Sequence, residues 1–259
     1  MYVGLELDRL GVTARLLALA YAAEGKRAQI QWSDLYTGKE TLSGKGPALP
    51  QPAEAIETAR AELAKLPLFL ALGAPEGWQM SNLETALAAI APEPGSWRPV
   101  LAVVDFLQLV APEPDARGDL RETIRTAAYR ARAMARKHNA CVVLVSSTAR
   151  EHYALLSGKR RGERGKMVGF TFQNEAPRLF LGTGKESGEI EYAADLALVL
   201  CRKRWKKDET PPPVWCAVAK QRAGKPAWVQ LDFDGAALTD PAARAAESTP
   251  KGGKYGLGY

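Results

Sequence analysis

The chain has 259 residues, of which 46% are hydrophobic and 25% charged, a composition that suits one large globular domain with a buried core. No apolar run approaches the roughly 18 residues of a membrane-spanning helix, and the charged start MYVGLELDRL is unlike a secretory signal. We therefore expect a cytoplasmic protein with no membrane attachment. The three cysteines, Cys141, Cys201 and Cys216, are widely spaced, so we expect reduced core thiols and neither disulfides nor a zinc site.

The net charge is +6 and the sequence pI is about 9.2, and the basic residues gather in two clusters. One is KRRGERGK at 159–166, and the other is RKRWKK at 202–207. Such clusters are either solvated loops or contacts with the phosphate backbone of nucleic acid. Under the second interpretation, Lys159, Arg160 and Arg161 are candidate DNA-binding residues.

Short apolar, β-branched runs alternate with longer segments of helical period, which predicts an α/β fold with a mostly parallel twisted sheet flanked by helices. In chain order, the predicted strands are residues 2–7, 68–72, 100–105, 141–146, 196–200, 214–219 and 228–233. The predicted helices are residues 9–24, 53–66, 82–90 and 119–138. The last two strands are expected to form a C-terminal antiparallel extension. Residues 1–240 are expected to make one core domain, and residues 241–259 a flexible tail.

The strand at 100–105 ends in Asp105, and a carboxylate in that position can reach nucleotide and magnesium at the edge of a parallel sheet. An aspartate at a strand end is alternatively a simple turn residue. The longer string VVDFLQL at 103–109 is more specific: it resembles the Walker B segment of the DnaB-like replicative helicases, a branch of the RecA-like ATPases. Other segments resemble that family in the same order: YVGLELD at 2–8, RLL at 15–17, LPLFL at 66–70, CVVLVSS at 141–147, KESGEIEYAAD at 185–195 and AKQRAG at 219–224.

The resemblance implies the C-terminal RecA-like ATPase domain of an ATP-hydrolysing DNA helicase. It also implies ATP and Mg²⁺ as cofactors, single-stranded DNA as substrate, self-association into a ring expected to be a hexamer, and other replication proteins as possible partners. Asp105 would hold Mg²⁺ through water. Glu6 would act as the general base that activates the attacking water, although it is alternatively an exposed strand acid.

Lys220 and Arg222 match the arginine-finger strand of the family, from which cations reach the nucleotide of a neighbouring subunit. Their alternative is a pair of surface cations on an edge strand. Because residues two apart on a strand share a face, both side chains are expected to point the same way.

Lys185, Glu186 and Gly188 match the family segment that lines the ring channel and binds the DNA backbone. The preceding segment, residues 152–182, is longer than usual for the family and could form an enlarged channel loop. Where the family has Ser-Gln at the end of the strand before it, this chain has Ser146-Ser147. Ser147 then takes the position of the glutamine that senses the γ-phosphate, and its side chain is too short for the same reach.

A phosphate loop of the form GxxxxGK[ST] does not occur in the sequence, since none of its eight Gly-Lys pairs is followed by Ser or Thr. In the family this loop precedes the strand matched by residues 2–7. Its own strand, expected to be missing here, lies between those matched by residues 141–146 and 196–200. Those two strands are then expected either to pair directly or to leave backbone groups unpaired. Alone, the chain is expected to bind ATP weakly or not at all.

The leading functional hypothesis is therefore an ATP-dependent DNA helicase motor domain that the missing loop leaves inactive on its own. The alternative is a non-catalytic nucleic-acid-binding or ring-associated protein derived from such a helicase. A recombinase-like or circadian-type RecA relative would share the fold, but it accounts less well for VVDFLQL, KESGEIEYAAD and AKQRAG together.

Overall fold

A computed structural model of the chain describes residues 1–22, 29–45, 48–72, 77–90, 100–114, 119–162, 165–184, 188, 190–204, 212–233 and 238–239. The expected tail at 241–259 and the DNA-binding candidates Lys185 and Glu186 lie outside these residues. Within them, none of the helices is both long enough and apolar enough to cross a membrane.

The predicted strands and helices are all present, with ends shifted by a few residues. The helices are α1 Arg9–Ala22, α2 Trp32–Thr37, α3 Pro52–Leu63, α4 Met80–Ile90, α5 Leu120–Lys137, α6 Tyr153–Leu156 and α7 Ile190–Ala193. The strands are β1 Tyr2–Gly4, β2 Gln29–Ile30, β3 Gly44–Lys45, β4 Leu70–Leu72, β5 Val100–Asp105, β6 Ala140–Leu144, β7 Lys159–Arg161, β8 Met167–Gly169, β9 Leu196–Cys201, β10 Val214–Gln221, β11 Ala227–Phe233 and β12 Leu238–Thr239.

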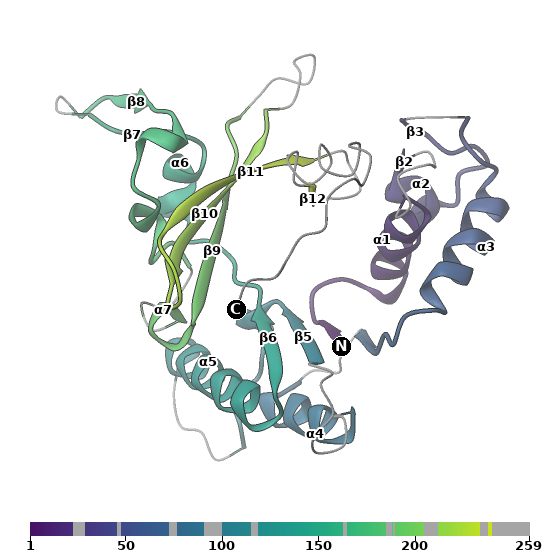
Figure 1. Cartoon of the computed structure of the whole chain (residues 1–259), viewed down its shortest axis with the longest axis horizontal. Coiled ribbons are helices and arrows are strands. Elements are labelled where there is room, and N and C mark those ends of the chain that lie inside the picture. The colour runs from purple at the N-terminus through teal and green to yellow at the C-terminus, as the bar shows by residue number, and fades with distance from the viewer. Residues whose placement is uncertain are drawn as a thin grey trace, which may run out of the picture.

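The strands form two main sheets (Figure 1). In the first, the order is β4-β1-β5-β6 and every neighbouring pair is parallel. In the second, the order is β12-β11-β10-β9 and every pair is antiparallel. The predicted α/β fold, a parallel sheet flanked by helices with an antiparallel extension, is confirmed.

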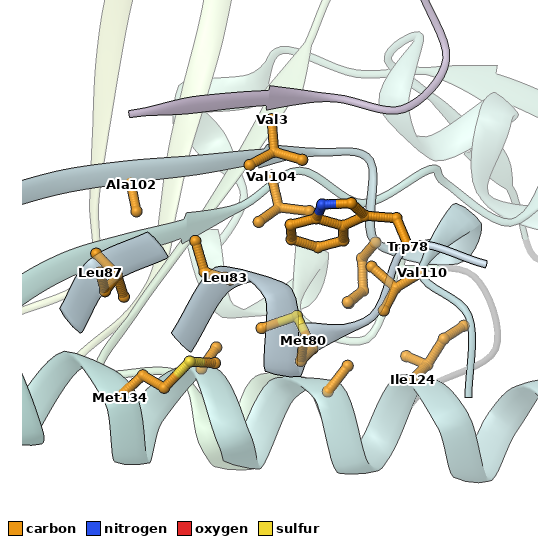
Figure 2. Close-up of a cluster of buried hydrophobic side chains, with 13 residues drawn as sticks. Val3, Trp78, Met80, Leu83, Leu87, Ala102, Val104, Val110, Ile124 and Met134 are labelled. Atoms are coloured by element: carbon orange, nitrogen blue, oxygen red, sulfur yellow. The ribbon is translucent and has the colours of Figure 1, made fainter. Parts of the chain in front are cut away.

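One face of the parallel sheet packs on α4 and α5 through the main hydrophobic core (Figure 2). Side chains alternate across β5, so Ala102 and Val104 are fully buried on this face. They meet apolar positions spaced three or four apart on α5, among them Ile124 and Met134. The helix begins at Asp119, whose carboxylate accepts a hydrogen bond from the Glu122 backbone N–H at 3.0 Å and so caps the first turn.

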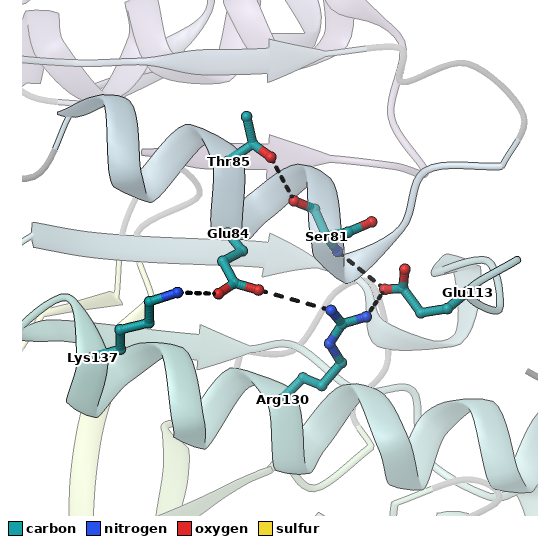
Figure 3. Close-up of polar contacts among 6 residues, drawn as sticks. All are labelled: Ser81, Glu84, Thr85, Glu113, Arg130 and Lys137. Atoms are coloured by element: carbon teal, nitrogen blue, oxygen red, sulfur yellow. Dashed lines mark hydrogen bonds and ion pairs between the residues drawn. The ribbon is translucent and has the colours of Figure 1, made fainter. Parts of the chain in front are cut away.

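A network of ion pairs and hydrogen bonds at the edge of this core joins α4 to α5 (Figure 3). Arg130 of α5 forms ion pairs with Glu113 and, at 3.8 Å, with Glu84 of α4. Lys137 Nζ donates a hydrogen bond to Glu84 at 2.7 Å, and this contact holds the pKa of Glu84 below its usual value. These contacts stabilise the packing of α4 against α5, the two helices that cover one face of the parallel sheet.

The opposite face of the parallel sheet is open. Leu101 is 54% exposed there, and Cys141, Val143 and Val145 along β6 are also exposed. Parallel sheets are ordinarily covered on both faces, so this face lacks cover from the described part of the chain.

The edges of the two sheets do not meet. β6 pairs only with β5 and β9 pairs only with β10 among the described strands. Of the two outcomes expected from the sequence, direct pairing of these strands does not occur. Leu196, Leu198 and Leu200 of β9 are each at least half exposed, so apolar side chains accompany both free edges.

The described residues form two smaller hydrophobic cores besides the main one. The α1, α2 and α3 group, on the far side of the parallel sheet from the antiparallel sheet in Figure 1, packs around Leu17, Tyr21 and Ile30. The antiparallel sheet packs its aromatic residues on Phe172 and Phe180. The short elements α2, α6, α7, β2, β3, β7, β8 and β12 were not predicted from the sequence.

Candidate nucleotide site

The carboxyl ends of β1, β5 and β6 lie side by side and bring together three of the predicted site residues. Asp105 is the last residue of β5 and lies opposite Gly4 in β1. Glu6 follows β1 in an exposed bend, because the strand ends at Gly4 and not at residue 7 as predicted. Ser147 follows β6. This edge is where ligands bind in open parallel sheets.

Asp105 is held in place by Tyr2, a residue that the sequence did not single out. The Tyr2 hydroxyl donates a hydrogen bond to Asp105 Oδ2 at 2.6 Å. Burial and this hydrogen bond raise the pKa of Tyr2, so its hydroxyl stays protonated and remains a donor at neutral pH. The ring passes over Gly4, where an added Cβ would lie 3.0 Å from Tyr2 Cε1. A side chain at position 4 would therefore crowd the Tyr2 ring where it extends toward the Asp105 carboxylate.

Two further charges act at the same place. The charge of Arg15 lowers the pKa of Tyr2 and that of Glu6 raises it, so both charges act electrostatically on the Tyr2 hydroxyl. Arg15 comes from α1, and its guanidinium lies 4.3 Å from the centre of the Trp32 ring. Two carboxylates and one guanidinium thus act on the Tyr2 hydroxyl, and the guanidinium packs on the Trp32 ring.

Gln108 joins the ends of β5 and β6. Its Nε2 donates a hydrogen bond to Ser146 Oγ at 2.8 Å, and its Oε1 accepts one from the Ser147 backbone N–H at 3.1 Å. The sequence identified Ser147 but missed Gln108, although Gln108 lies in the VVDFLQL string. Its amide fixes the position of Ser147 relative to Asp105.

Lys220 and Arg222 lie elsewhere, at the end of β10. Lys220 Nζ donates a hydrogen bond to the carbonyl oxygen of Glu191 in α7. The Arg222 guanidinium forms an ion pair with Asp195 at 3.1 Å and donates to the Tyr192 carbonyl oxygen at 3.4 Å. Because β10 has a register shift before Lys220 and ends at Gln221, Arg222 lies beyond the strand. The expected alternation on one strand therefore does not apply, but both cations contact α7 or the residues just after it.

The remaining predicted residues belong to the DNA-binding set. Lys159, Arg160 and Arg161 make up β7 and are all exposed. Gly188 is exposed as well. The segment that was expected to form an enlarged loop contains the β7–β8 hairpin.

The residues at the sheet edge fit magnesium better than they fit a nucleotide. Mg²⁺ commonly takes one or two carboxylates and keeps several waters, which one acid such as Asp105 can support. In the described parts of the chain, no group of three or more His, Cys, Asp or Glu side chains could enclose a metal. For the phosphates, the sequence offers no GxxxxGK[ST] cradle.

Comparison with known proteins identifies the family. A model of the DnaB-like helicase C terminal domain matches residues 3–239. The chain belongs to the DnaB-like helicase C-terminal domain family. The resemblance that VVDFLQL and its companion segments carried is thereby confirmed. No curated protein matches the sequence.

Solved structures support the fold of this DnaB-like domain. One is a DnaB-like replicative helicase described with its interactions with primase; it is 18% identical, has a TM-score of 0.67, and the match covers 92% of this chain and 49% of that one. Another is a structure described as an ATPase domain, which is 17% identical with a TM-score of 0.67, the match covering 92% of this chain and 73% of that one. The chain thus spans about half the length of the first of these proteins.

Proposed function

We propose that the chain is the motor domain of an ATP-dependent DNA helicase that works on single-stranded DNA as part of a ring. One observation carries the proposal: in a DnaB-like domain, Glu6, Asp105 and Ser147 follow three neighbouring parallel strands at one edge. Acid groups at that edge suit phosphoryl-transfer chemistry, which depends on positioning and on neutralising charge.

In this proposal the chain's own residues have distinct tasks. Asp105 would hold Mg²⁺ through water, and the Tyr2 hydroxyl, which donates to Oδ2, would keep the carboxylate in place for that role. Glu6 is exposed and carries the general-base role, accepting a proton from the attacking water. Ser147, whose backbone N–H is held by Gln108, takes the sensor position after β6, although its side chain is shorter than the glutamine that it replaces.

Ring assembly is the proposed task of Lys220 and Arg222. The Arg222 side chain is 43% exposed although it pairs with Asp195. Such a cation can exchange its partner for a phosphate on a neighbouring subunit, where it would stabilise transition-state charge. The replicative helicase that resembles this chain is described with primase, which suggests other replication proteins as partners.

A non-catalytic nucleic-acid-binding protein is the second candidate, and two sequence features favour it. They are the lack of a GxxxxGK[ST] loop and the replacement of the sensor glutamine by Ser147. Both remove contacts to the phosphates and leave the basic clusters intact. The two candidates differ in ATP turnover and agree on DNA binding.

The test measures ATP hydrolysis by the purified chain with and without single-stranded DNA, for the native sequence and for Glu6→Gln, Asp105→Asn and Arg222→Ala. Turnover that DNA stimulates and that each substitution abolishes would establish a DNA-dependent ATPase activity for this chain alone, as a helicase motor requires. We expect instead DNA binding without turnover, and turnover once a phosphate-loop strand and helix are fused ahead of Met1. A fusion that binds ATP but never hydrolyses it would leave the second candidate standing.

A further inference from the structure

The chain that leaves β6 connects the parallel sheet to other parts of the molecule. Past the end of β6, backbone pairing with the β5 segment continues for one residue. The Val145 N–H donates to the Val104 carbonyl oxygen at 3.0 Å, and the Val145 carbonyl oxygen accepts from the Leu107 N–H at 2.8 Å. Beyond Val145, the two contacts already described for the Gln108 side chain take the place of this backbone pairing.

Gln108 holds two consecutive residues with the two ends of one amide. It lies in the 3₁₀ turn Leu107–Leu109 that follows β5, and it is half-buried. Its Nε2 reaches the Ser146 side chain and its Oε1 reaches the Ser147 backbone, so the amide fixes both the position and the orientation of this dipeptide. These are the two serines that stand where the family has Ser-Gln. A glutamine is therefore present at this edge, but it comes from the end of β5.

Directly after these serines, the chain pairs with a segment that is distant in sequence. Thr148 forms an antiparallel β-bridge with Gly184. The Ala149 backbone N–H donates to the Thr183 carbonyl oxygen at 3.1 Å. Gly184 also lies close to the first serine, since a Cβ added to it would be 3.4 Å from Ser146 Oγ. The residues that Gln108 holds are thus in contact with residues 183 and 184.

Residues 183 and 184 are in turn anchored away from the parallel sheet. Thr183 is buried, and its hydroxyl donates to the carbonyl oxygen of Phe180 at 3.0 Å. Phe180 belongs to the aromatic core of the antiparallel sheet. A Cβ added to Gly184 would be 3.7 Å from Cδ1 of Ile190, the first residue of α7. Residues 183 and 184 therefore lie between the aromatic core, α7 and the dipeptide that Gln108 holds.

We propose that Gln108 is a positioning residue for DNA binding. Through the end of β6 it holds residues 183 and 184, which directly precede the candidate DNA-binding segment that begins at Lys185. The choice of DNA as ligand rests on the proposed function. Gln108 is uncharged and takes no part in contacting the strand, so its loss lowers the affinity without changing the number of phosphates bound.

Native-state hydrogen exchange of the full chain tests the structural part of this inference. Gln108→Leu removes both hydrogen bonds and keeps a side chain of similar size. The Ala149 amide, which donates to Thr183, should then exchange about fivefold faster, because the end of β6 has lost hydrogen bonds that restrain it. Amides of β10, which has a strand on either side, should exchange as in the native chain.

Two further variants separate the Gln108 contacts from a general loss of stability. Gln108→Glu keeps an acceptor for the Ser147 N–H and can accept the Ser146 hydroxyl, so it should restore slow exchange of the Ala149 amide. The matched control is Gln79→Leu, which loses a hydrogen bond of 2.7 Å to the Pro112 carbonyl oxygen at the start of α4. It should leave the Ala149 amide unchanged.

Fluorescence anisotropy of a labelled oligothymidine, without nucleotide and across a range of salt concentrations, tests the functional part. Gln108→Leu should bind about fivefold more weakly at every salt concentration. Its log–log salt slope should equal that of the native chain, because no phosphate contact is lost. Gln79→Leu should bind as the native chain does, and Gln108→Glu should bind more tightly than Gln108→Leu. If Gln108→Leu does not fold, Ser146→Ala, which removes only the Nε2 contact, serves for both measurements.

The outcomes distinguish this inference from the proposed function. Native exchange of the Ala149 amide in Gln108→Leu would overturn the structural link, and faster exchange with unchanged DNA affinity would overturn its role in binding. A smaller salt slope in Gln108→Leu would mean that phosphate contacts are lost, which also contradicts a positioning role. Each of these results leaves the helicase proposal intact. A native chain that binds no single-stranded DNA at any salt would overturn both.

Discussion

At the scale of single residues, the site depends on a tyrosine that reaches across a glycine. The Tyr2 ring reaches Asp105 of β5 past Gly4, where an added Cβ would lie 3.0 Å from Tyr2 Cε1 and crowd the ring. A predicted strand ending in aspartate identifies Asp105, but nothing in a one-dimensional pattern says which side chain of a neighbouring strand will contact it. Tyr2 and Gln108 were missed for that reason: both act through the register of β1, β5 and β6.

Substituting Tyr2 tests this contact through its pH dependence. The folded-state pKa of Tyr2 is raised, so its stabilising effect is complete below the unfolded value near 10 and is lost as the pH rises above it. Tyr2→Phe should cost about 1 kcal/mol at pH 8, because the hydrogen bond to a charged group is only half-buried. Urea unfolding should show that the difference in the free energy of unfolding between the native chain and Tyr2→Phe is smaller at pH 10.5 than at pH 8. A difference that is the same at both pH values would contradict the assigned contact. The control is Tyr192→Phe, a substitution at an exposed position.

At the scale of elements, the sequence pattern predicted the strands and long helices well and the short elements poorly. β5 was predicted with the same bounds that the structure shows, since an apolar run ending in Asp105 is distinctive. The β7–β8 hairpin was missed, because its residues are basic and exposed and its pairing depends on tertiary contacts such as Arg160–Glu175. The free edges of β6 and β9 could be anticipated only as one of two outcomes.

The two faces of the parallel sheet should respond differently to truncation. Leu83 of α4 is fully buried against one face, so Leu83→Ala should destabilise the chain by about 2–5 kcal/mol. Leu101 projects from the open face and is 54% exposed, so Leu101→Ala should cost less than about 1 kcal/mol. Chemical denaturation of both variants measures the difference. Equal costs would mean that the open face is covered in solution.

The free edges of β6 and β9 make a prediction for hydrogen exchange. In each strand, the amides directed away from the sheet have no strand partner among the described residues, so they should exchange as fast as those of loops. Amides of β5 and β10, which have a strand on either side, should be protected. Native-state exchange resolves the two classes, and uniform protection along β6 and β9 would show that a strand occupies the space between them.

At the scale of the whole molecule, the candidate functional residues lie in separate elements of the structure. The acids lie at the edge of the parallel sheet, Lys220 and Arg222 contact α7, and the basic strand β7 belongs to the hairpin that follows α6. The family and the fold could be predicted from the sequence, because motifs such as VVDFLQL and AKQRAG keep their order along the chain. The contact between the end of α6 and the residue after β9 could not, since it depends on the packing of the Arg202 backbone against Leu156.

We propose that this chain carries the acidic edge of a nucleotide site, although its sequence has no GxxxxGK[ST] motif to hold the phosphates. Calorimetric titration of the purified chain with Mg-ATP, followed by single-stranded DNA at low salt, tests it most directly. The account predicts no saturable heat with ATP and clear binding of DNA. Saturable ATP binding in the micromolar range that Asp105→Asn abolishes would contradict it, because the phosphates would then be held by residues of this chain.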